Sequence, residues 1–234
     1  FSTEYYEILA VKTLYTKGIK KRKRRFGMEA KKHSWHGPKQ IGMMIYTAIL
    51  FLIGTSIIGG NNNTVFPMFS EIRGWDVNVI NVVSGLACIA KAIGVLVLAR
   101  VVRKTGAKNL TTVTLILSAL LLIVFGTTKS LPLFLIVILI IGFLGGGYEK
   151  NGGMTLTASW WPTKKGIVLG FTTMGIVAMN FLYVPMMPKL LGKLGLGGGM
   201  TVIAVILIIV AIITAICVKN NPEEAGEYPD GDPT

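Results

Sequence analysis

Runs of about 20 apolar residues recur along the chain and limit what it can fold into. Leu110 to Phe125 and Met200 to Val218 are almost purely aliphatic. A helix of that length crosses the hydrocarbon core of a lipid bilayer. The sequence of 234 residues is 52% hydrophobic and only 15% charged, and its mean hydropathy is +0.62. A soluble domain of this size does not need so much apolar surface. The sequence therefore predicts an all-α integral membrane protein.

The apolar runs predict six transmembrane helices separated by short turns. They lie at about 41–70, 77–101, 110–126, 131–158, 166–187 and 200–218. Residues 1–40 read as a basic, partly amphipathic segment, and 220–234 as an acidic, proline-containing tail that we expect to be flexible. The first and fourth segments carry polar interruptions, the second and fifth carry isolated polar residues, and the third and sixth are aliphatic. This order is typical of the 3+3 inverted repeat inside one half of a secondary transporter.

The net charge of +13 raises the question of nucleic-acid binding. Its distribution favours membrane topology instead, because 11 of the 24 Lys and Arg residues fall in the first 39 residues and most others fall in short loops. With the N-terminus in the cytosol, 18 basic residues lie on the inside and 4 on the outside. We expect both termini in the cytosol, in a plasma or inner membrane, and no nucleic-acid partner. The cluster Lys20 to Arg25 either lies on an anionic leaflet or belongs to a disordered tail.

Polar residues interrupt two of the predicted spans. Tyr148, Glu149, Lys150 and Asn151 follow a long apolar run and are surrounded by glycines. A charged residue inside a span costs roughly 2.5–3.5 kcal/mol on insertion scales, so such residues usually face a cavity or a partner. In the first span, Asn61, Asn62 and Asn63 follow two glycines. They line a cavity beside a tilted or broken helix, or the span ends at Gly60 and they form an outer loop.

Lys91 is the other intramembrane cation. Glu149 and Lys150 are adjacent, so on a helix they point about 100° apart and we expect them not to pair well. Counting about 1.5 Å per residue from the outer ends places Lys91 and Glu149 within roughly 5 Å in depth. The sequence thus predicts a Lys91–Glu149 ion pair between the second and fourth spans. Two roles stay open for it, a purely structural one and one in substrate or proton coupling.

Signatures of enzymes are missing from the sequence. It contains neither a His-Glu-x-x-His nor a Gly-x-Ser-x-Gly motif, and no histidine or aspartate falls within a predicted span. The two cysteines, Cys88 and Cys217, lie in apolar segments and read as reduced. We expect no enzymatic activity, no metal site and no cofactor.

Two motifs carry a resemblance to a known family. Trp161-Pro162-Thr163-Lys164-Lys165-Gly166, followed by Gly170 and Gly175, resembles the turn between helices four and five of major facilitator superfamily transporters of the oxalate–formate antiporter and monocarboxylate transporter group. The stretch 221–231, NPEEAGEYPDG, is similar to that group's sequence after helix six. The resemblance covers about 40–234. It implies the N-terminal six-helix half of a transporter that moves a small organic anion, such as a mono- or dicarboxylate, by alternating access, coupled to a proton or a counter-anion.

In this reading, the candidate substrate contacts are Asn61, Asn62, Asn63, Lys91, Tyr148, Glu149, Lys150 and Asn151. The candidate cytosolic gating residues are Arg100, Arg103, Lys104, Lys164 and Lys165. The family's loop between helices two and three usually reads G-x-x-x-D-[RK]-x-G-[RK]. Here Ala99 and Arg103 replace its first glycine and its aspartate, which puts ordinary cytosolic gating in doubt.

The family's transporters place the substrate between two six-helix halves, and the cationic anchors for the carboxylate are expected in the other half. The chain is then a fragment, one chain of a split transporter, or a half that self-associates. In the last case Lys91 or Lys150 would take the place of the missing anchor. The alternative function is a non-transporting membrane scaffold or receptor-like subunit with the same half-fold.

Overall fold

The computed structural model describes residues 37–231, apart from the side chains of Asn62 and Asn63, and within that range it contains helices and no strands. In chain order the elements are α2 (Pro38–Thr55), η1 (Ser56–Gly60), α3 (Asn61–Arg73), α4 (Val77–Thr105), α5 (Ala107–Thr127), α6 (Leu131–Gly145), η2 (Gly146–Gly152), α7 (Gly153–Trp160), α8 (Lys165–Cys217), η3 (Pro222–Ala225) and η4 (Pro229–Gly231). The predicted all-helical class is confirmed. Most of the predicted basic segment, 1–36, and the last three residues lie outside the described range.

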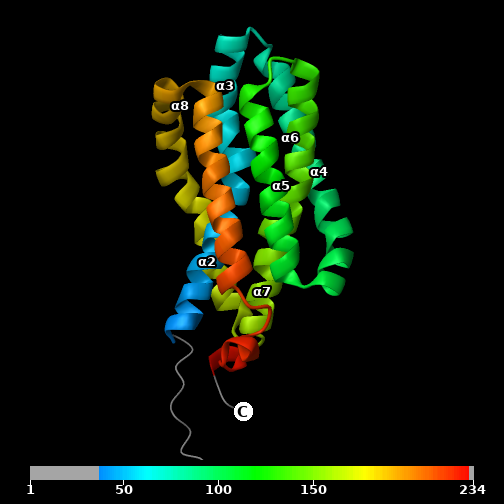
Figure 1. The fold of residues 1–234 in the computed structure, drawn as a ribbon, viewed down its shortest axis with the longest axis vertical. Coiled ribbons are helices and arrows are strands. Elements are labelled where there is room, and N and C mark those ends of the chain that lie inside the picture. The colour runs from blue at the N-terminus through cyan, green and yellow to red at the C-terminus, as the bar shows by residue number, and fades with distance from the viewer. Residues whose placement is uncertain (1–36, 232–234) are drawn as a thin grey trace, which may run out of the picture.

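Five of the described helices are long and apolar enough to cross a membrane. They are Pro38–Gly60, Val77–Thr105, Ala107–Thr127, Leu131–Trp160 and Lys165–Cys217. Figure 1 shows them side by side, roughly along the long axis of the molecule. The first helix continues through η1 into α3, so the helical stretch that begins at Pro38 ends at Arg73. The segments predicted as spans at 41–70, 77–101, 110–126 and 131–158 lie within these helices.

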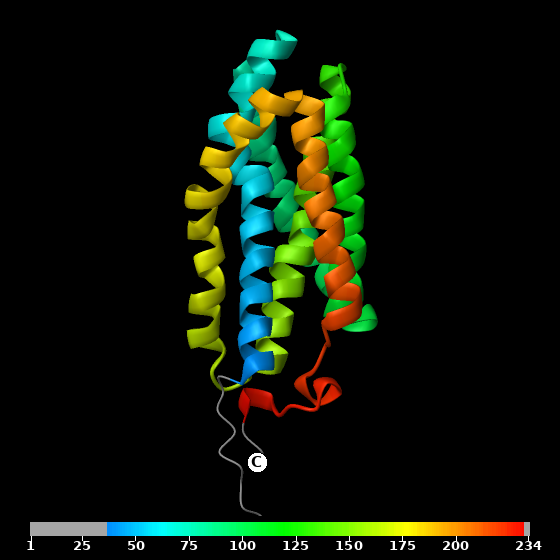
Figure 2. The ribbon, with the colours of Figure 1, turned by 60° about the vertical axis from the view of Figure 1, so that its left-hand side comes forward.

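The last of these helices, α8, is 53 residues long, whereas about 20 residues cross a bilayer. It bends at Gly195, where the backbone has φ 71° and ψ 173°. Figure 2 shows the two arms of α8 running in opposite directions, one on either side of α2 in that view. The segments expected at 166–187 and 200–218 lie in these two arms. The predicted turn over 189–199 is wrong in extent, because helix continues to Gly195 from both sides. Glycine adopts this conformation without the strain that a Cβ would add.

The polar interruptions are turns of π-helix, not breaks. η1 and η2 each lie within an otherwise continuous helix, and both are rich in glycine. Asn61 begins α3, so the alternative in which the asparagines form an outer loop is wrong. π-helical turns occur mostly as single bulges inside α-helices and frequently at functional sites. These two turns set the positions of the polar residues that the sequence singled out.

Glycines bring α4 against the helix that contains α6 and η2. A methyl group on Gly94 would overlap the carbonyl oxygen of Phe143, and one on Gly142 would overlap that of Ala87. A Cβ on Gly146 would lie 2.6 Å from the backbone nitrogen of Val95. Small residues at such positions let two helix backbones approach closely in a membrane. This close approach places Lys91 of α4 beside η2.

The tail after α8 is folded against one end of the bundle, so its predicted flexibility is wrong for the described residues. The Asp230 carboxylate accepts hydrogen bonds from the backbone N–H and the hydroxyl of Thr163, at 3.1 and 2.8 Å, and from the backbone N–H of Lys164 at 3.1 Å. The Asn220 side chain accepts a hydrogen bond from the backbone N–H of Lys108 at 2.8 Å. The tail thus connects the α7–α8 turn with the α4–α5 loop. Figure 1 shows it at the same end of the bundle as the start of α2.

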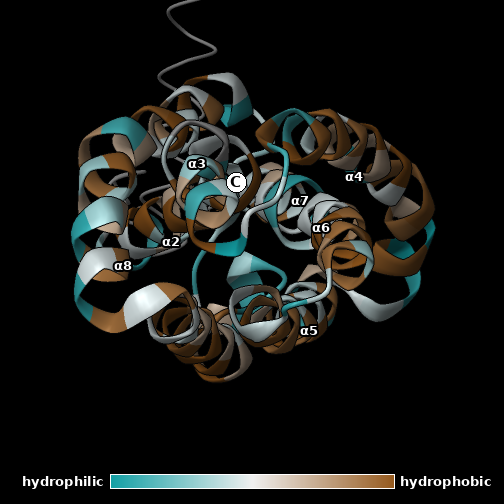
Figure 3. Cartoon of the chain, turned by 90° about the horizontal axis from the view of Figure 1, so that it is seen from above, coloured by the Kyte–Doolittle hydropathy of each residue, from teal (hydrophilic) through white to brown (hydrophobic). Residues whose placement is uncertain are grey.

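Much of the helical ribbon in Figure 3 is brown, the colour of hydrophobic residues, and many large apolar side chains are exposed. The least buried span is α4. Leu96 of α4 is 71% exposed, and Phe181 in the first arm of α8 is 74% exposed. Apolar surface of this extent needs lipid or another chain to cover it.

Candidate functional site

Three charged side chains meet between α4 and η2, and we call them the charged triad: Lys91, Glu149 and Lys150. The ammonium of Lys91 donates a hydrogen bond to Oε2 of Glu149. The ammonium of Lys150 lies 2.9 Å from Oε1 of the same carboxylate. The predicted Lys91–Glu149 ion pair is therefore confirmed. The expectation that Glu149 and Lys150 do not pair is wrong, because the flexible four-carbon stem of lysine can turn its ammonium back toward its neighbour.

Glu149 is the buried member of the triad. Its side chain is 1% exposed, against 17% for Lys91 and 30% for Lys150. A buried carboxylate is tolerated when both of its oxygens are paired, as they are here. The absence of a side chain at Gly54 of α2 makes room for it, since a methyl group there would overlap Oε2 of Glu149. The π-helical turn and a glycine on the facing helix together accommodate the charge.

The ammonium of Lys150 makes a second contact, with an aromatic ring of α2. Its nitrogen lies 4.8 Å from the centre of the Phe51 ring, on α2. A cation within about 6 Å of an aromatic ring centre is attracted by the negative face of the ring. The same lysine is the most exposed member of the triad, so its ammonium is the one most accessible to a ligand.

The triad opens onto a cavity of about 670 Å³ between α2, α4, the η2–α7 segment and the first arm of α8. Ligand pockets usually measure about 300–1,000 Å³. Apart from the triad, its lining is uncharged: Thr55, Cys88, Ala92, Val95, Leu96, Met154 and Ile176. Two ammonium groups and one carboxylate leave the lining with one excess positive charge.

Cys88 also lines the cavity, and the sequence did not predict this role for it. It is exposed, and it lies three positions before Lys91 on α4. Residues three or four apart share one face of a helix, so this spacing could have identified it. Within the described residues, no group of three His, Cys, Asp or Glu side chains could hold a metal ion.

Two of the expected substrate contacts, Asn61 and Asn151, are committed to the backbone of the π-helical turns. The amide of Asn61 donates to the carbonyl of Ile57 at 2.6 Å, and its oxygen accepts from the Tyr183 hydroxyl at 2.5 Å. The amide of Asn151 donates to the carbonyls of Val95 and Gly146, at 3.0 and 3.1 Å. Asn61 directly follows η1 and Asn151 lies within η2, so each asparagine satisfies a carbonyl of its π-helical turn and ties that turn to a neighbouring helix.

The other expected contacts also lie away from the cavity or outside the described side chains. Tyr148 is 1% exposed, and it is not among the residues that line the cavity. Asn62 and Asn63 belong to α3, and their side chains lie outside the described part of the structure. Of the six expected substrate contacts whose side chains are described, Lys91, Glu149 and Lys150 come together at the cavity.

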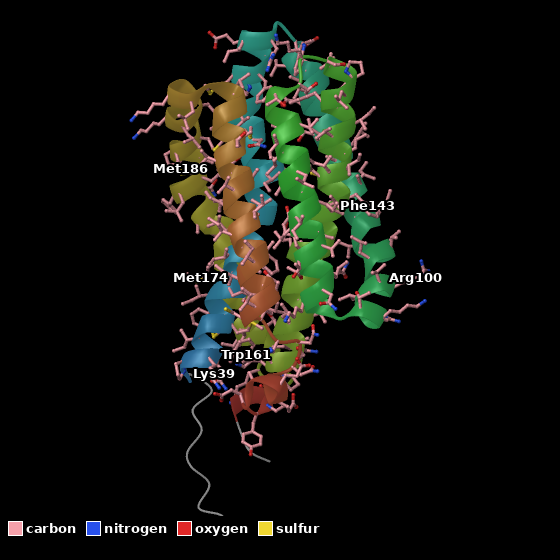
Figure 4. The ribbon with its side chains drawn as sticks, viewed as in Figure 1. Lys39, Arg100, Phe143, Trp161, Met174 and Met186 are labelled. Carbon is pink, nitrogen blue, oxygen red and sulfur yellow. The ribbon has the colours of Figure 1, made fainter. Side chains whose placement is uncertain are left out.

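The expected gating residues all lie at the end of the bundle where the tail folds. Arg100, Arg103 and Lys104 are exposed at the end of α4, and Figure 4 shows Arg100 pointing away from the bundle. None of these three forms an ion pair with a residue in 37–231. Lys165 is also exposed, whereas Lys164 lies against Asp230.

Comparison with known proteins identifies the family. No curated protein matches the sequence. Residues 42–233, most of the chain, match the family model described as Major Facilitator Superfamily. This is a family of transporters, so the chain is a secondary transporter and not an enzyme. The finer resemblance to the oxalate–formate and monocarboxylate group stays a prediction. The apolar helices, the glycine-mediated packing and the match over most of the sequence lead to one conclusion: the chain belongs to the Major Facilitator Superfamily.

Proposed function

We propose that this transporter moves a small organic anion, a mono- or dicarboxylate, by alternating access past the charged triad. The observation that carries the proposal is the excess positive charge of an otherwise uncharged cavity. An unbalanced charge in an apolar site is costly, and an anion from solution would offset it. A carboxylate is the simplest organic group that carries the matching charge.

Lys150 is the ammonium that we expect to bind the substrate. It is more exposed than Lys91, and its carboxylate partner, Glu149, is also paired with Lys91. If the ammonium of Lys150 moves to a substrate carboxylate, Glu149 stays paired with Lys91. The buried carboxylate is then never left alone, which would cost about 3–5 kcal/mol. Glu149 would hold the lysine in place until the substrate arrives.

A single substitution in the cavity would distinguish coupling to a proton from exchange with a counter-anion. Among the described residues that line the cavity, Glu149 is the only carboxylate. Proton coupling would use this group, so replacing it with glutamine would abolish the dependence of uptake on a pH gradient. Antiport needs no titrating group, because two anions can use Lys150 in turn, and exchange would survive that replacement.

The two π-helical turns support a 3+3 repeat. The helix that contains η1 and the helix that contains η2 would be the first members of two three-helix units, with the arms of α8 as the fifth and sixth spans. Irregular helices at corresponding positions of two repeats are typical of transporter binding sites. We propose that a second six-helix half covers the open side of the cavity. A second copy, a separate chain or a further part of a longer protein could provide it.

Orientation follows from the basic loops. Arg100, Arg103 and Lys104 lie at the end of α4, and Lys164 and Lys165 lie where α8 begins. We place this end in the cytosol, together with both termini, in a plasma or inner membrane. At that end the exposed cations would contact acidic groups of the second half and stabilise one of the two access states.

The test uses Cys88 as a reporter inside the cavity. The protein is reconstituted into liposomes, and the rate at which a maleimide modifies Cys88 is measured with and without formate, oxalate or lactate. Cys217 lies at the end of α8, far along the chain from the triad, and is the internal control. We expect a carboxylate to slow modification of Cys88 several-fold and to leave Cys217 unchanged.

Two variants sharpen the test. Lys150→Gln should remove the protection, whereas Lys129→Gln, which removes an exposed cation between α5 and α6, should retain it. Uptake of the labelled carboxylate is measured on the same liposomes. Protection with uptake supports the transport of organic anions. Protection without uptake favours the scaffold or receptor-like alternative, and no protection by any carboxylate contradicts the anion site.

A further inference from the structure

A second cavity lies at the end of the bundle where the tail folds, and we call it the end cavity. Its volume is about 280 Å³, near the lower end of the usual range for ligand pockets. It is lined by Lys39, Gly42, Met43, Tyr46, Trp160, Ile213, Cys217, Val218, Lys219 and Ala225. We propose that the end cavity binds the phosphate head group of an anionic phospholipid. This site is separate from the charged triad, and the inference does not rest on the proposed substrate.

Lys39 and Lys219 give the end cavity its charge. The ammonium of Lys39 donates to the carbonyl of Ala225 at 2.6 Å and lies 3.7 Å from Oε1 of Glu227, and its side chain is 55% exposed. Within residues 37–231, the ammonium of Lys219 has neither an ion-pair nor a hydrogen-bond partner. Two lysines against one carboxylate leave one positive charge, which matches the single negative charge of a phosphodiester. Basic pockets between transmembrane helices bind anionic lipid head groups in this way.

The backbone of Lys219 is held in place beside the cavity. Its carbonyl accepts a hydrogen bond from Nε1 of Trp160 at 3.2 Å. Lys39 lies in the first turn of α2, and Figure 4 shows it at the same end of the bundle as Trp161. The two cations are therefore carried by separate elements that the folded tail brings together.

The rest of the lining is largely apolar and lies at the ends of α2, α7 and α8 that face the tail. Met43, Trp160 and Ile213 provide apolar surface, and Ile213 is 44% exposed on the outside of α8. Tyr46 is tied to Thr214 by a hydrogen bond of 2.7 Å between their hydroxyls. Trp and Tyr are enriched where a membrane meets water. The cationic groups at this end would contact the phosphate of a lipid, and the apolar side chains along α8 would contact its acyl chains. A free phosphate would contact the cationic groups alone.

The test follows modification of Cys217, which is exposed and lines the end cavity. The protein is reconstituted into vesicles of phosphatidylcholine alone and into vesicles of equal parts phosphatidylcholine and phosphatidylglycerol. An uncharged maleimide is added, and the modified peptides are quantified by mass spectrometry. We expect phosphatidylglycerol to slow modification of Cys217 several-fold relative to Cys88. Soluble glycerol 3-phosphate, added to the phosphatidylcholine vesicles, should not protect Cys217, because it lacks the acyl chains.

A matched pair of variants separates a site from general attraction to a charged surface. Lys39→Gln with Lys219→Gln should abolish the protection. Lys189→Gln with Lys193→Gln removes the same charge from exposed positions at the opposite end of the bundle and should retain it. Equal modification rates in the two vesicle types, or equal loss of protection in both double variants, would overturn the proposal. Protection by glycerol 3-phosphate alone would replace the lipid with a soluble phosphate ligand.

Discussion

The ammonium of Lys150 lies 2.9 Å from the carboxylate of Glu149, the residue that precedes it in the chain. The other oxygen of that carboxylate is paired with Lys91 of α4. One buried anion thus joins two helices and holds two cations at the wall of a cavity. The arrangement has consequences for stability that can be measured independently of transport.

Replacing Glu149 should destabilise the bundle more than replacing either lysine. Glu149→Gln leaves two partly buried ammonium groups without their counter-ion, for an expected loss of about 3–5 kcal/mol. Lys91→Gln leaves the carboxylate paired with Lys150, so the expected loss is about 1–3 kcal/mol. Denaturant titration in mixed micelles would give the free energies of unfolding. In a double-mutant cycle, Lys91→Gln should cost less in the Glu149→Gln background, and strict additivity would contradict the ion pair.

The backbone contact between α4 and α6 predicts that alanine substitutions at two glycines of α4 will have different effects on thermal stability. Gly94→Ala forces a methyl group against the carbonyl oxygen of Phe143, and rigid backbone cannot move aside as a side chain can. Gly85→Ala is the matched control, because a methyl group there meets nothing within 4 Å. We expect Gly94→Ala to lower the thermal unfolding midpoint in detergent and Gly85→Ala to leave it unchanged or raise it, since alanine is favoured over glycine in a helix by about 0.5–1 kcal/mol. Equal midpoints would show that the helices can separate without cost.

The sequence alone was sufficient for the class of the fold, because a membrane span is a local property of about 20 residues. It also predicted the pairing of Lys91 with Glu149, because helical rise converts sequence position into depth. The π-helical turns could not be predicted in the same way. They depend on Asn61 and Asn151, whose partners include atoms of other helices, such as the Tyr183 hydroxyl and the Val95 carbonyl.

Two expectations depended on polar residues whose partners the sequence does not show. Asparagines in an apolar span indicated a polar cavity, and in the fold the amides of Asn61 and Asn151 bond to backbone carbonyls of η1 and η2. The acidic tail seemed flexible because its sequence is polar and contains proline. Its order depends on Asp230, whose carboxylate accepts hydrogen bonds from the backbone of Thr163 and Lys164, which are far away in the sequence. Both cases involve a polar side chain whose partner only the fold brings near.

The hydrogen bond between Asn61 and Tyr183 predicts that Asn61→Ala will lower the free energy of unfolding more than Tyr183→Phe. Asn61→Ala leaves the Tyr183 hydroxyl and the Ile57 carbonyl without their partner in a buried site, for a loss of about 1–3 kcal/mol. Tyr183→Phe removes one hydroxyl and leaves the Asn61 amide on the Ile57 carbonyl, so its loss should be smaller, about 0.5–1.5 kcal/mol. The measurement is again the free energy of unfolding in mixed micelles. A larger loss for Tyr183→Phe than for Asn61→Ala would contradict the assignment of Asn61 as the link between the two.

The docking of the tail predicts a local effect of Asp230 on hydrogen exchange. Asp230→Asn keeps the size of the side chain, and asparagine tolerates the left-handed backbone found here, with φ 57°. It removes the negative charge that faces the first amides of the α7–α8 turn, so those hydrogen bonds weaken. We expect the amides of Thr163 and Lys164 to exchange faster, together with those of the tail, while the amides of α5 stay protected. Glu223→Gln removes one negative charge from an exposed position in the same tail and is the control. If Asp230→Asn and Glu223→Gln give the same exchange rates at Thr163 and Lys164, the Asp230 carboxylate does not hold the tail against the turn.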